Sequence, residues 1–259
     1  MDRRKLRTNS VAFGVAPVLS PRTIKPLLVP TSVTRFGNSA DADQLEDERN
    51  PLIPSDRGSI PVAFPISQGA VILDFCGPRE VFHSADIPGR RGEVFQTYTV
   101  AETLEPIAAS GGMKIVPNYT FQTAPAPKVV VIPAQAAPTQ AMLNWVRSVT
   151  KATDVTMSVC TGAFLLAETG LLSGKSATTF HEAYARFEAR YPDIHLKRGA
   201  RFVEDGNLAS AGGLSSGIDL AIRVIERYFG REAAERTAYA LEYQGKGWQN
   251  PNSNGIYAH

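Results

Sequence analysis

The fold is decided by the stretch Asp154-Val155-Thr156-Met157-Ser158-Val159-Cys160-Thr161-Gly162-Ala163-Phe164-Leu165-Leu166-Ala167. A run of β-branched and apolar residues ends at a thiol, and small residues that can start a helix follow at once. This is the order of a nucleophile elbow, in which a reactive side chain occupies the sharp turn between a strand and a helix. Free N–H groups at a helix start favour an anion, so the stretch predicts a Cys160 thiol that ionises near neutral pH. The alternative is a buried, unreactive cysteine, because free cysteine is among the most buried residue types.

Strand and helix patterns alternate on both sides of this elbow. The apolar run 128–133 is typical of a parallel strand covered on both faces. Asp205-Gly206 predicts the turn of a hairpin. Further strands are expected at 60–66, 95–100 and 114–116, and helices from about 78, then at 139–149, 162–169, 184–191, 215–229 and 232–243. The alternation predicts an α/β fold, a three-layer flavodoxin-like sandwich with a mostly parallel sheet and helices on both faces.

Composition divides the 259 residues into an extension (1–57), an α/β domain (58–243) and a polar C-terminal tail (244–259) that we expect to be irregular. The formal net charge is +2, but the first 30 residues carry +5 and the remainder −3. Because the basic excess belongs to the extension, it does not indicate a nucleic-acid partner. No apolar run approaches the length of a transmembrane helix, so no membrane span is expected.

The extension and the cysteines bear on where the protein works. Arg3 and Arg4 precede a short apolar segment, Val11 to Leu19, which resembles a twin-arginine export signal. Pro17 interrupts that segment, and the alternative is a disordered basic tail on a cytoplasmic protein. The two cysteines, Cys76 and Cys160, form neither a disulfide framework nor a metal-ligand spacing, and we expect no metal and no cofactor.

Three candidate site segments lie where strands or turns are expected to end. They are Asp74, the loop Pro133–Gln135 and Cys160. In open α/β sheets, sites form at the carboxyl ends of the strands. An acid and a thiol that meet at one edge of the sheet favour the reactive interpretation of Cys160 over the structural one.

Three segments resemble loops of the ThiJ/PfpI superfamily, which has the class I glutamine-amidotransferase-like fold. Residues 158–179 are similar to its elbow and the strand that follows, 74–82 to its first acidic loop, and 211–219 to its last Gly-rich loop. The resemblance covers about residues 58–243. Within the superfamily the likeness is to isonitrile hydratases and to the sensor domains of AraC-type regulators, although no helix-turn-helix segment follows Tyr243 here.

This resemblance implies roles for five residues. Cys160 would be the nucleophile, Asp74 the acid that bonds the sulfur and handles protons, and Thr161 a donor of its N–H and hydroxyl to the substrate. Gly212 and Gly213 would shape the wall of the pocket. The implied protein is a homodimeric, cysteine-dependent hydro-lyase that converts a small isonitrile into an N-substituted formamide. Asp74 could instead cap a helix near Gly77–Pro78.

Two loops depart from the family pattern. Where the family has Pro-Gly-Gly, this chain has Pro133-Ala134-Gln135, which puts side chains where the backbone must approach the substrate. Where the family has Thr-Thr-His, this chain has Thr179-Phe180-His181, which moves the imidazole by one residue. Ala134, Gln135 and His181 are therefore candidate substrate-binding residues whose contacts differ from the family's.

These departures leave three functions open. The first is isonitrile hydration. The second is a glyoxalase-like or amidase-like reaction on a carbonyl substrate, favoured by the altered loop and the displaced histidine. The third is a ligand-sensing or redox-responsive domain without catalysis, favoured by the missing glycines.

Overall fold

A computed structural model describes residues 51–54 and 58–259. In this part of the chain the main sheet has the order β10-β11-β7-β6-β1-β2-β5, and all neighbouring strands are parallel except β10 and β11. The strands are β1 (Ile60–Pro65), β2 (Phe95–Ala101), β5 (Tyr119–Thr120), β6 (Val129–Ile132), β7 (Val155–Val159), β10 (Phe202–Asp205) and β11 (Leu208–Ala211). The extension with its twin-arginine motif lies outside the described residues, apart from 51–54.

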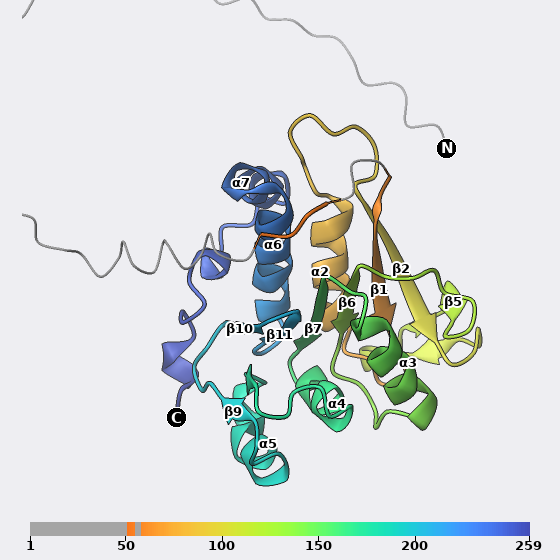
Figure 1. The fold of residues 1–259 in the computed structure, drawn as a ribbon, viewed down its shortest axis with the longest axis vertical. Helices are drawn as coiled ribbons and strands as arrows, with labels where there is room; N and C mark the ends of the chain where they lie inside the picture. The colour runs from red at the N-terminus through yellow and green to blue at the C-terminus, as the bar shows by residue number, and fades with distance from the viewer. Residues whose placement is uncertain (1–50, 55–57) are drawn as a thin grey trace, which may run out of the picture. The chain divides into compact units, whose positions relative to one another are not determined.

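Helices cover both faces of this sheet, which confirms the predicted three-layer α/β sandwich (Figure 1). One layer holds α2 (Ile72–His83), α6 (Ser216–Phe229) and α7 (Arg231–Ala240). The other layer holds α3 (Gln140–Thr150), α4 (Gly162–Glu168) and α5 (Tyr184–Arg190). None of the described helices is both long enough and apolar enough to cross a membrane.

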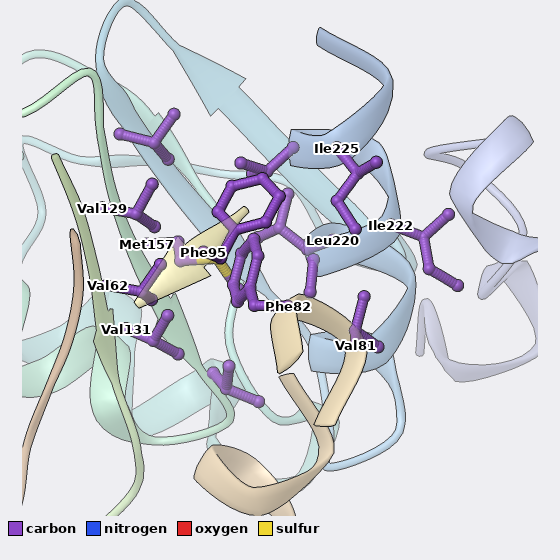
Figure 2. Close-up of a cluster of buried hydrophobic side chains, with 14 of the residues drawn as sticks. Val62, Val81, Phe82, Phe95, Val129, Val131, Met157, Leu220, Ile222 and Ile225 are labelled. Atoms are coloured by element: carbon purple, nitrogen blue, oxygen red, sulfur yellow. The ribbon is translucent and has the colours of Figure 1, made fainter. Parts of the chain in front are cut away.

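Two apolar cores lie between these layers. Successive residues of β6 alternate between them: Val129 and Val131 join the core under α2 and α6, and Val130 and Ile132 join the core under α3 and α4. Figure 2 shows the first core, where side chains of the sheet meet Val81 and Phe82 of α2 and Leu220 of α6. This burial on both faces explains the uninterrupted apolar run in the sequence.

Shorter elements complete the described chain. Two small sheets pair β3 (Ile107–Ala108) with β4 (Lys114–Ile115) and β8 (Ser176–Ala177) with β9 (His195–Leu196). The 3-10 turns are η1 (Ser110–Gly112), η2 (His181–Ala183), η3 (Gly247–Gln249) and η4 (Gly255–Tyr257). Most of these short elements carry too few residues to produce a sequence period, so the sequence did not predict them.

Helix α2 begins at Ile72, six residues before the predicted start at Pro78. The Gly-Pro pair reads as a helix start, but Pro78 lies inside the helix. A Cβ atom at Gly77 would come within 2.9 Å of the Ile218 side chain, so the glycine lets α2 approach α6 closely. The packing between these helices therefore outweighs the local signal at Pro78.

The C-terminal tail is more ordered than its composition suggests. It forms η3 and η4, and it buries the Trp248 side chain, which is 3% exposed. Figure 1 follows this dark blue segment from α7 past β10. The backbone N–H of Arg201, the residue before β10, donates to the carbonyl of Pro251 in the tail.

Candidate active site

The carboxyl ends of the parallel strands meet at one edge of the sheet and bring the predicted segments together. Cys160 follows β7, Ala134 follows β6 and Gly212 follows β11. Asp74 lies in the first turn of α2, whose start is joined to the β6 loop because the Val71 N–H donates to the Ala134 carbonyl at 2.8 Å. Asp74 and Cys160, which are 86 residues apart in the sequence, therefore lie at the same edge of the sheet.

Cys160 has the backbone of a nucleophile elbow. Its φ is +57°, in the left-handed region that costs a side-chain-bearing residue about 1–3 kcal/mol. The surroundings hold this conformation: the Cys160 N–H donates to the Gly212 carbonyl at 2.8 Å, and the Cys160 carbonyl accepts from the Thr179 hydroxyl at 2.9 Å. A Cβ atom at Gly162 would lie 2.3 Å from the Ile132 carbonyl oxygen, so the turn requires glycine at that position.

The sulfur of Cys160 is buried and surrounded by donors, and the residue is 6% exposed. The backbone N–H groups of Thr161 and Leu214 and the Thr161 hydroxyl all hydrogen-bond the sulfur and stabilise its anion. Burial and, second, the charge of Asp74 outweigh these donors and raise the pKa of the thiol to about 11. The prediction of a thiol that ionises near neutral pH is therefore wrong: the resting group is a protonated thiol.

Asp74 is fully buried beside that thiol. Its Oδ2 accepts a hydrogen bond of 3.0 Å from the Ala134 N–H, and its Oδ1 has no hydrogen-bond partner in the described part of the chain. Burial raises the pKa of Asp74 to about 6, against the opposing effect of the Ala134 bond. The carboxyl makes no capping bond near Gly77–Pro78, because α2 starts upstream of those residues.

A pocket of about 290 Å³ opens next to these groups. It is lined by residues from five parts of the chain: Leu73; Thr179, Phe180, His181 and Tyr184; Arg201; Gly212 to Ser215; and Asn254 and Tyr257. The lining holds the neighbours of both reactive groups, since Leu73 precedes Asp74 and the Leu214 N–H bonds the Cys160 sulfur. Cys160, Asp74 and Thr161 are not themselves among the lining residues, so the pocket adjoins the segments that carry the thiol and the carboxyl, and neither group forms part of its wall.

The predicted binding residues divide into two groups. Gly212, Gly213 and His181 line the pocket, and a Cβ atom at Gly213 would come within 2.9 Å of the Phe180 ring. Ala134 and Gln135 do not appear in the lining. The Ala134 N–H is committed to Asp74, and the Gln135 Nε2 donates to the Pro65 carbonyl at 3.1 Å, so this loop positions the acid.

Sequence reasoning missed several groups in the pocket. Leu214 follows the Gly-rich loop that the sequence analysis did select, so its N–H could have been found there. Asn254 and Tyr257 carry no local signal, because only the path of the tail brings them to the pocket, and Arg201, the residue before β10, carries none either. Ser215 directly precedes α6, but its hydroxyl makes no capping bond and instead accepts from the Arg201 guanidinium at 3.0 Å.

The arrangement can support covalent catalysis by a thiol with a proton-handling acid. A carboxyl group whose pKa lies near the working pH can both accept and return a proton. N–H groups aimed at the sulfur can stabilise a thiolate that forms during the reaction. Within residues 51–54 and 58–259, no group of three or more His, Cys, Asp or Glu side chains is placed to hold a metal ion.

Comparisons with known proteins show the family of this chain and the structures that share its fold. Residues 61–227 match the DJ-1/PfpI family. The chain is 34% identical over 176 residues to an isonitrile hydratase of Pseudomonas putida, covering 66% of this chain and 73% of that protein. Its fold superposes on a ThiJ/PfpI family protein from Pseudomonas syringae with a TM-score of 0.63 and 24% identity, covering 84% of each chain. It also superposes on an AraC family transcriptional regulator from Pseudomonas putida with a TM-score of 0.60 and 18% identity, covering 70% of this chain and 99% of the other.

Proposed function

We propose, from the premise that this chain belongs to the DJ-1/PfpI family, that it hydrates an isonitrile to an N-substituted formamide, with Cys160 as nucleophile and Asp74 as proton carrier. One observation carries the proposal. A fully buried carboxyl group with a free Oδ1 lies close enough to a buried thiol for its charge to raise the pKa of that thiol. The similarity to an isonitrile hydratase supports the choice of substrate.

The first half of the reaction joins sulfur to substrate. At neutral pH most of Asp74 is a carboxylate, because its pKa is about 6, while Cys160 is a thiol. Asp74 takes the thiol proton and delivers it to the terminal carbon of the isonitrile as the sulfur attacks that carbon. The product is a thioimidate, in which one C–H bond and one C–S bond have formed and the S–H bond has broken. N–H groups of Thr161 and Leu214 stabilise the charge on sulfur during this step.

The second half adds water. Asp74 removes a proton from water as the water oxygen attacks the thioimidate carbon, and it passes that proton to the nitrogen. Asp74 then takes the remaining hydroxyl proton as the C=O bond forms and the C–S bond breaks, and it returns this proton to the departing sulfur as the formamide leaves. The balance is isonitrile plus water to formamide, with the thiol and the carboxylate restored, so no oxidant or cofactor is consumed.

The raised pKa of the thiol suits this reaction. An isonitrile carbon has to gain a proton, and a neutral thiol beside a carboxylate supplies that proton together with the nucleophile. The same property disfavours a redox-sensing role, because redox-sensor cysteines have a low pKa and are accessible to solvent. Cys160 is 6% exposed, with a pKa of about 11.

The test measures formamide production from benzyl isonitrile by the purified full chain. We expect turnover by the wild type and by Cys76→Ala, which removes the exposed cysteine, and no turnover by Cys160→Ala. Asp74→Asn should lose at least about 100-fold in kcat, as expected for a general acid–base group. Failure to hydrate any isonitrile, or equal activity in Cys160→Ala, would contradict the proposal.

A carbonyl substrate is the second candidate, because a carboxyl group with a pKa near 6 can also remove a proton next to a carbonyl. Methylglyoxal consumption by the same set of variants tests it. Loss of methylglyoxal that depends on Cys160, without formamide production from isonitriles, would favour this second function.

A further inference from the structure

The C-terminal tail forms one side of the pocket. Asn254 and Tyr257 belong to the lining, although they follow the predicted α/β domain in sequence. The Tyr257 ring stacks on the ring of His181 with a centroid distance of 4.6 Å and an interplanar angle of 28°. His181 in turn contacts Phe180 edge to face, with centroids 4.5 Å apart. The tail therefore adds a ring to an aromatic wall that starts within the domain.

Asp219 of α6 holds the tail in place through hydrogen bonds and an ion pair. Its carboxylate is fully buried, accepts from the Trp248 N–H at 2.9 Å and from the Tyr243 hydroxyl at 3.0 Å, and pairs with the Arg201 guanidinium. A Cβ atom at Gly247 would lie 2.7 Å from the Asp219 Oδ2, so the tail backbone sits directly on the carboxylate. These contacts give the tail a fixed position at the pocket.

Arg201 contacts both Asp219 and the pocket, but it does not make the pocket an anion-binding site. The guanidinium also donates to Asn254 of the tail at 3.3 Å and to Ser215 at 3.0 Å. It is the one permanently charged side chain among the lining residues, and Asp219 compensates its charge. Because a compensated guanidinium with its donors engaged attracts anions weakly, the pocket fits an uncharged substrate.

The volume of the pocket further limits the size of substrate that can bind. A closed cavity of about 150 Å³ is enough to hold benzene. This pocket has about 290 Å³, room for a ring together with a small reacting group, and far more than a one-carbon substituent fills. The aromatic side chains His181, Tyr257, Phe180 and Tyr184 give that space flat surfaces against which a ring can pack.

We infer that Tyr257 is a specificity-determining residue, and that the substrate is an uncharged molecule whose ring-sized apolar substituent packs against Tyr257 and His181 while its reacting carbon meets Cys160. This inference rests on the proposed function for the identity of the reacting group. In this inference the tail selects the substituent of the substrate, and Asp219 acts indirectly by holding the tail in place.

The test compares benzyl isonitrile with methyl isonitrile on three proteins: wild type, Tyr257→Ala and the control Tyr239→Ala, whose tyrosine on α7 is 87% exposed. Tyr257→Ala should lower kcat/KM for benzyl isonitrile about tenfold, mainly through KM, and change that for methyl isonitrile less than about threefold. Tyr257→Phe should restore the benzyl rate, and Tyr239→Ala should match the wild type. Equal effects of Tyr257→Ala on the two substrates, or no effect on either, would overturn the inference.

A binding measurement separates this inference from the proposed reaction. Calorimetric titration of the Cys160→Ala protein, which cannot turn over, compares N-benzylformamide with N-methylformamide. We expect the benzyl compound to bind at least about tenfold more tightly and to lose that advantage when Tyr257→Ala is added. Equal affinities, or no binding of the benzyl compound, would overturn the ring preference, whether or not isonitriles are hydrated. Tighter binding of the benzyl compound without turnover of any isonitrile would instead contradict the proposed reaction and support the role of Tyr257 in specificity.

Discussion

The carboxyl group of Asp74 lies close enough to the Cys160 thiol for its negative charge to oppose ionisation of the sulfur. Burial acts on both groups in the same sense, so the pKa of the acid rises to about 6 and that of the thiol to about 11. The pair therefore rests with the proton on sulfur and the charge on oxygen, and a substrate that accepts a proton completes the transfer.

This relationship predicts the alkylation behaviour of the thiol. In a Cys76→Ser background, the rate of iodoacetamide modification of Cys160 should rise with pH and reach half its plateau well above ~8.5, the value of a free cysteine. Asp74→Asn should shift that midpoint to lower pH, because the carboxylate charge no longer opposes ionisation. A midpoint below ~8.5 in the parent protein would contradict the raised pKa.

Asp74 should also cost the protein stability at neutral pH. Its pKa rises from 3.8 to about 6 on folding, so the folded state binds more protons than the unfolded state between these values, and stability falls as pH rises through them. A shift of about two pKa units corresponds to about 3 kcal/mol, lost in full above pH 6. Urea unfolding should therefore show Asp74→Asn more stable than the wild type at pH 7, by up to about 3 kcal/mol, and about equal near pH 4. A less stable variant at pH 7 would contradict this prediction.

The same group predicts the acid limb of the rate profile. Protonated Asp74 cannot take the thiol proton, so kcat/KM should fall about tenfold per pH unit below about 6. The measurement subtracts the enzyme-free hydrolysis of the isonitrile at each pH. Residual activity in Asp74→Asn should lack this limb, and an unchanged limb in that variant would assign the titration to another group.

Gly162 should tolerate no side chain. A Cβ atom there would lie 2.3 Å from the Ile132 carbonyl oxygen, which is backbone and cannot move without shifting β6. We expect Gly162→Ala to lower the free energy of unfolding by about 2 kcal/mol or more and to reduce activity. Gly255→Ala is the matched control, because its Cβ atom would meet nothing within 4 Å and its free energy of unfolding should change by less than about 0.5 kcal/mol.

Asp219 should be essential to the position of the tail. Asp219→Ala leaves the Arg201 guanidinium without its partner carboxylate, and removing one member of a buried pair costs about 3–5 kcal/mol. In a Trp145→Phe background, the fluorescence of Trp248 should also shift to the red as the tail loosens. Asp86→Ala breaks a half-exposed pair with Arg236 and should cost less than about 1 kcal/mol. Equal losses in the two variants would contradict an anchoring role.

The fold and the meeting of Asp74 with Cys160 at one edge of the sheet follow from local signals in the sequence. The elbow at Cys160 and the apolar run 128–133 predict the layers because both reflect neighbours along the chain. The family match likewise confirms the recognised superfamily. Dimerisation, the absence of a nucleic-acid partner and the domain boundaries stay predictions.

The remaining features depend on contacts between distant segments. The donor at Thr161 was predicted, but the Leu214 N–H and the sign of the thiol's pKa shift were not, because both depend on packing that no local window contains. The start of α2 was misplaced because contact with Ile218 outweighs the Gly77-Pro78 signal. The tail contributes to the pocket through Asp219, which lies 38 residues before Tyr257.

The position of Tyr257 has a practical consequence for handling the protein. An affinity tag fused after His259 would begin three positions beyond Tyr257, whose ring lines the pocket, so its histidines would lie close to that pocket. A tag at the N-terminus, removed after purification, should allow substrate preference to be measured without interference at the pocket.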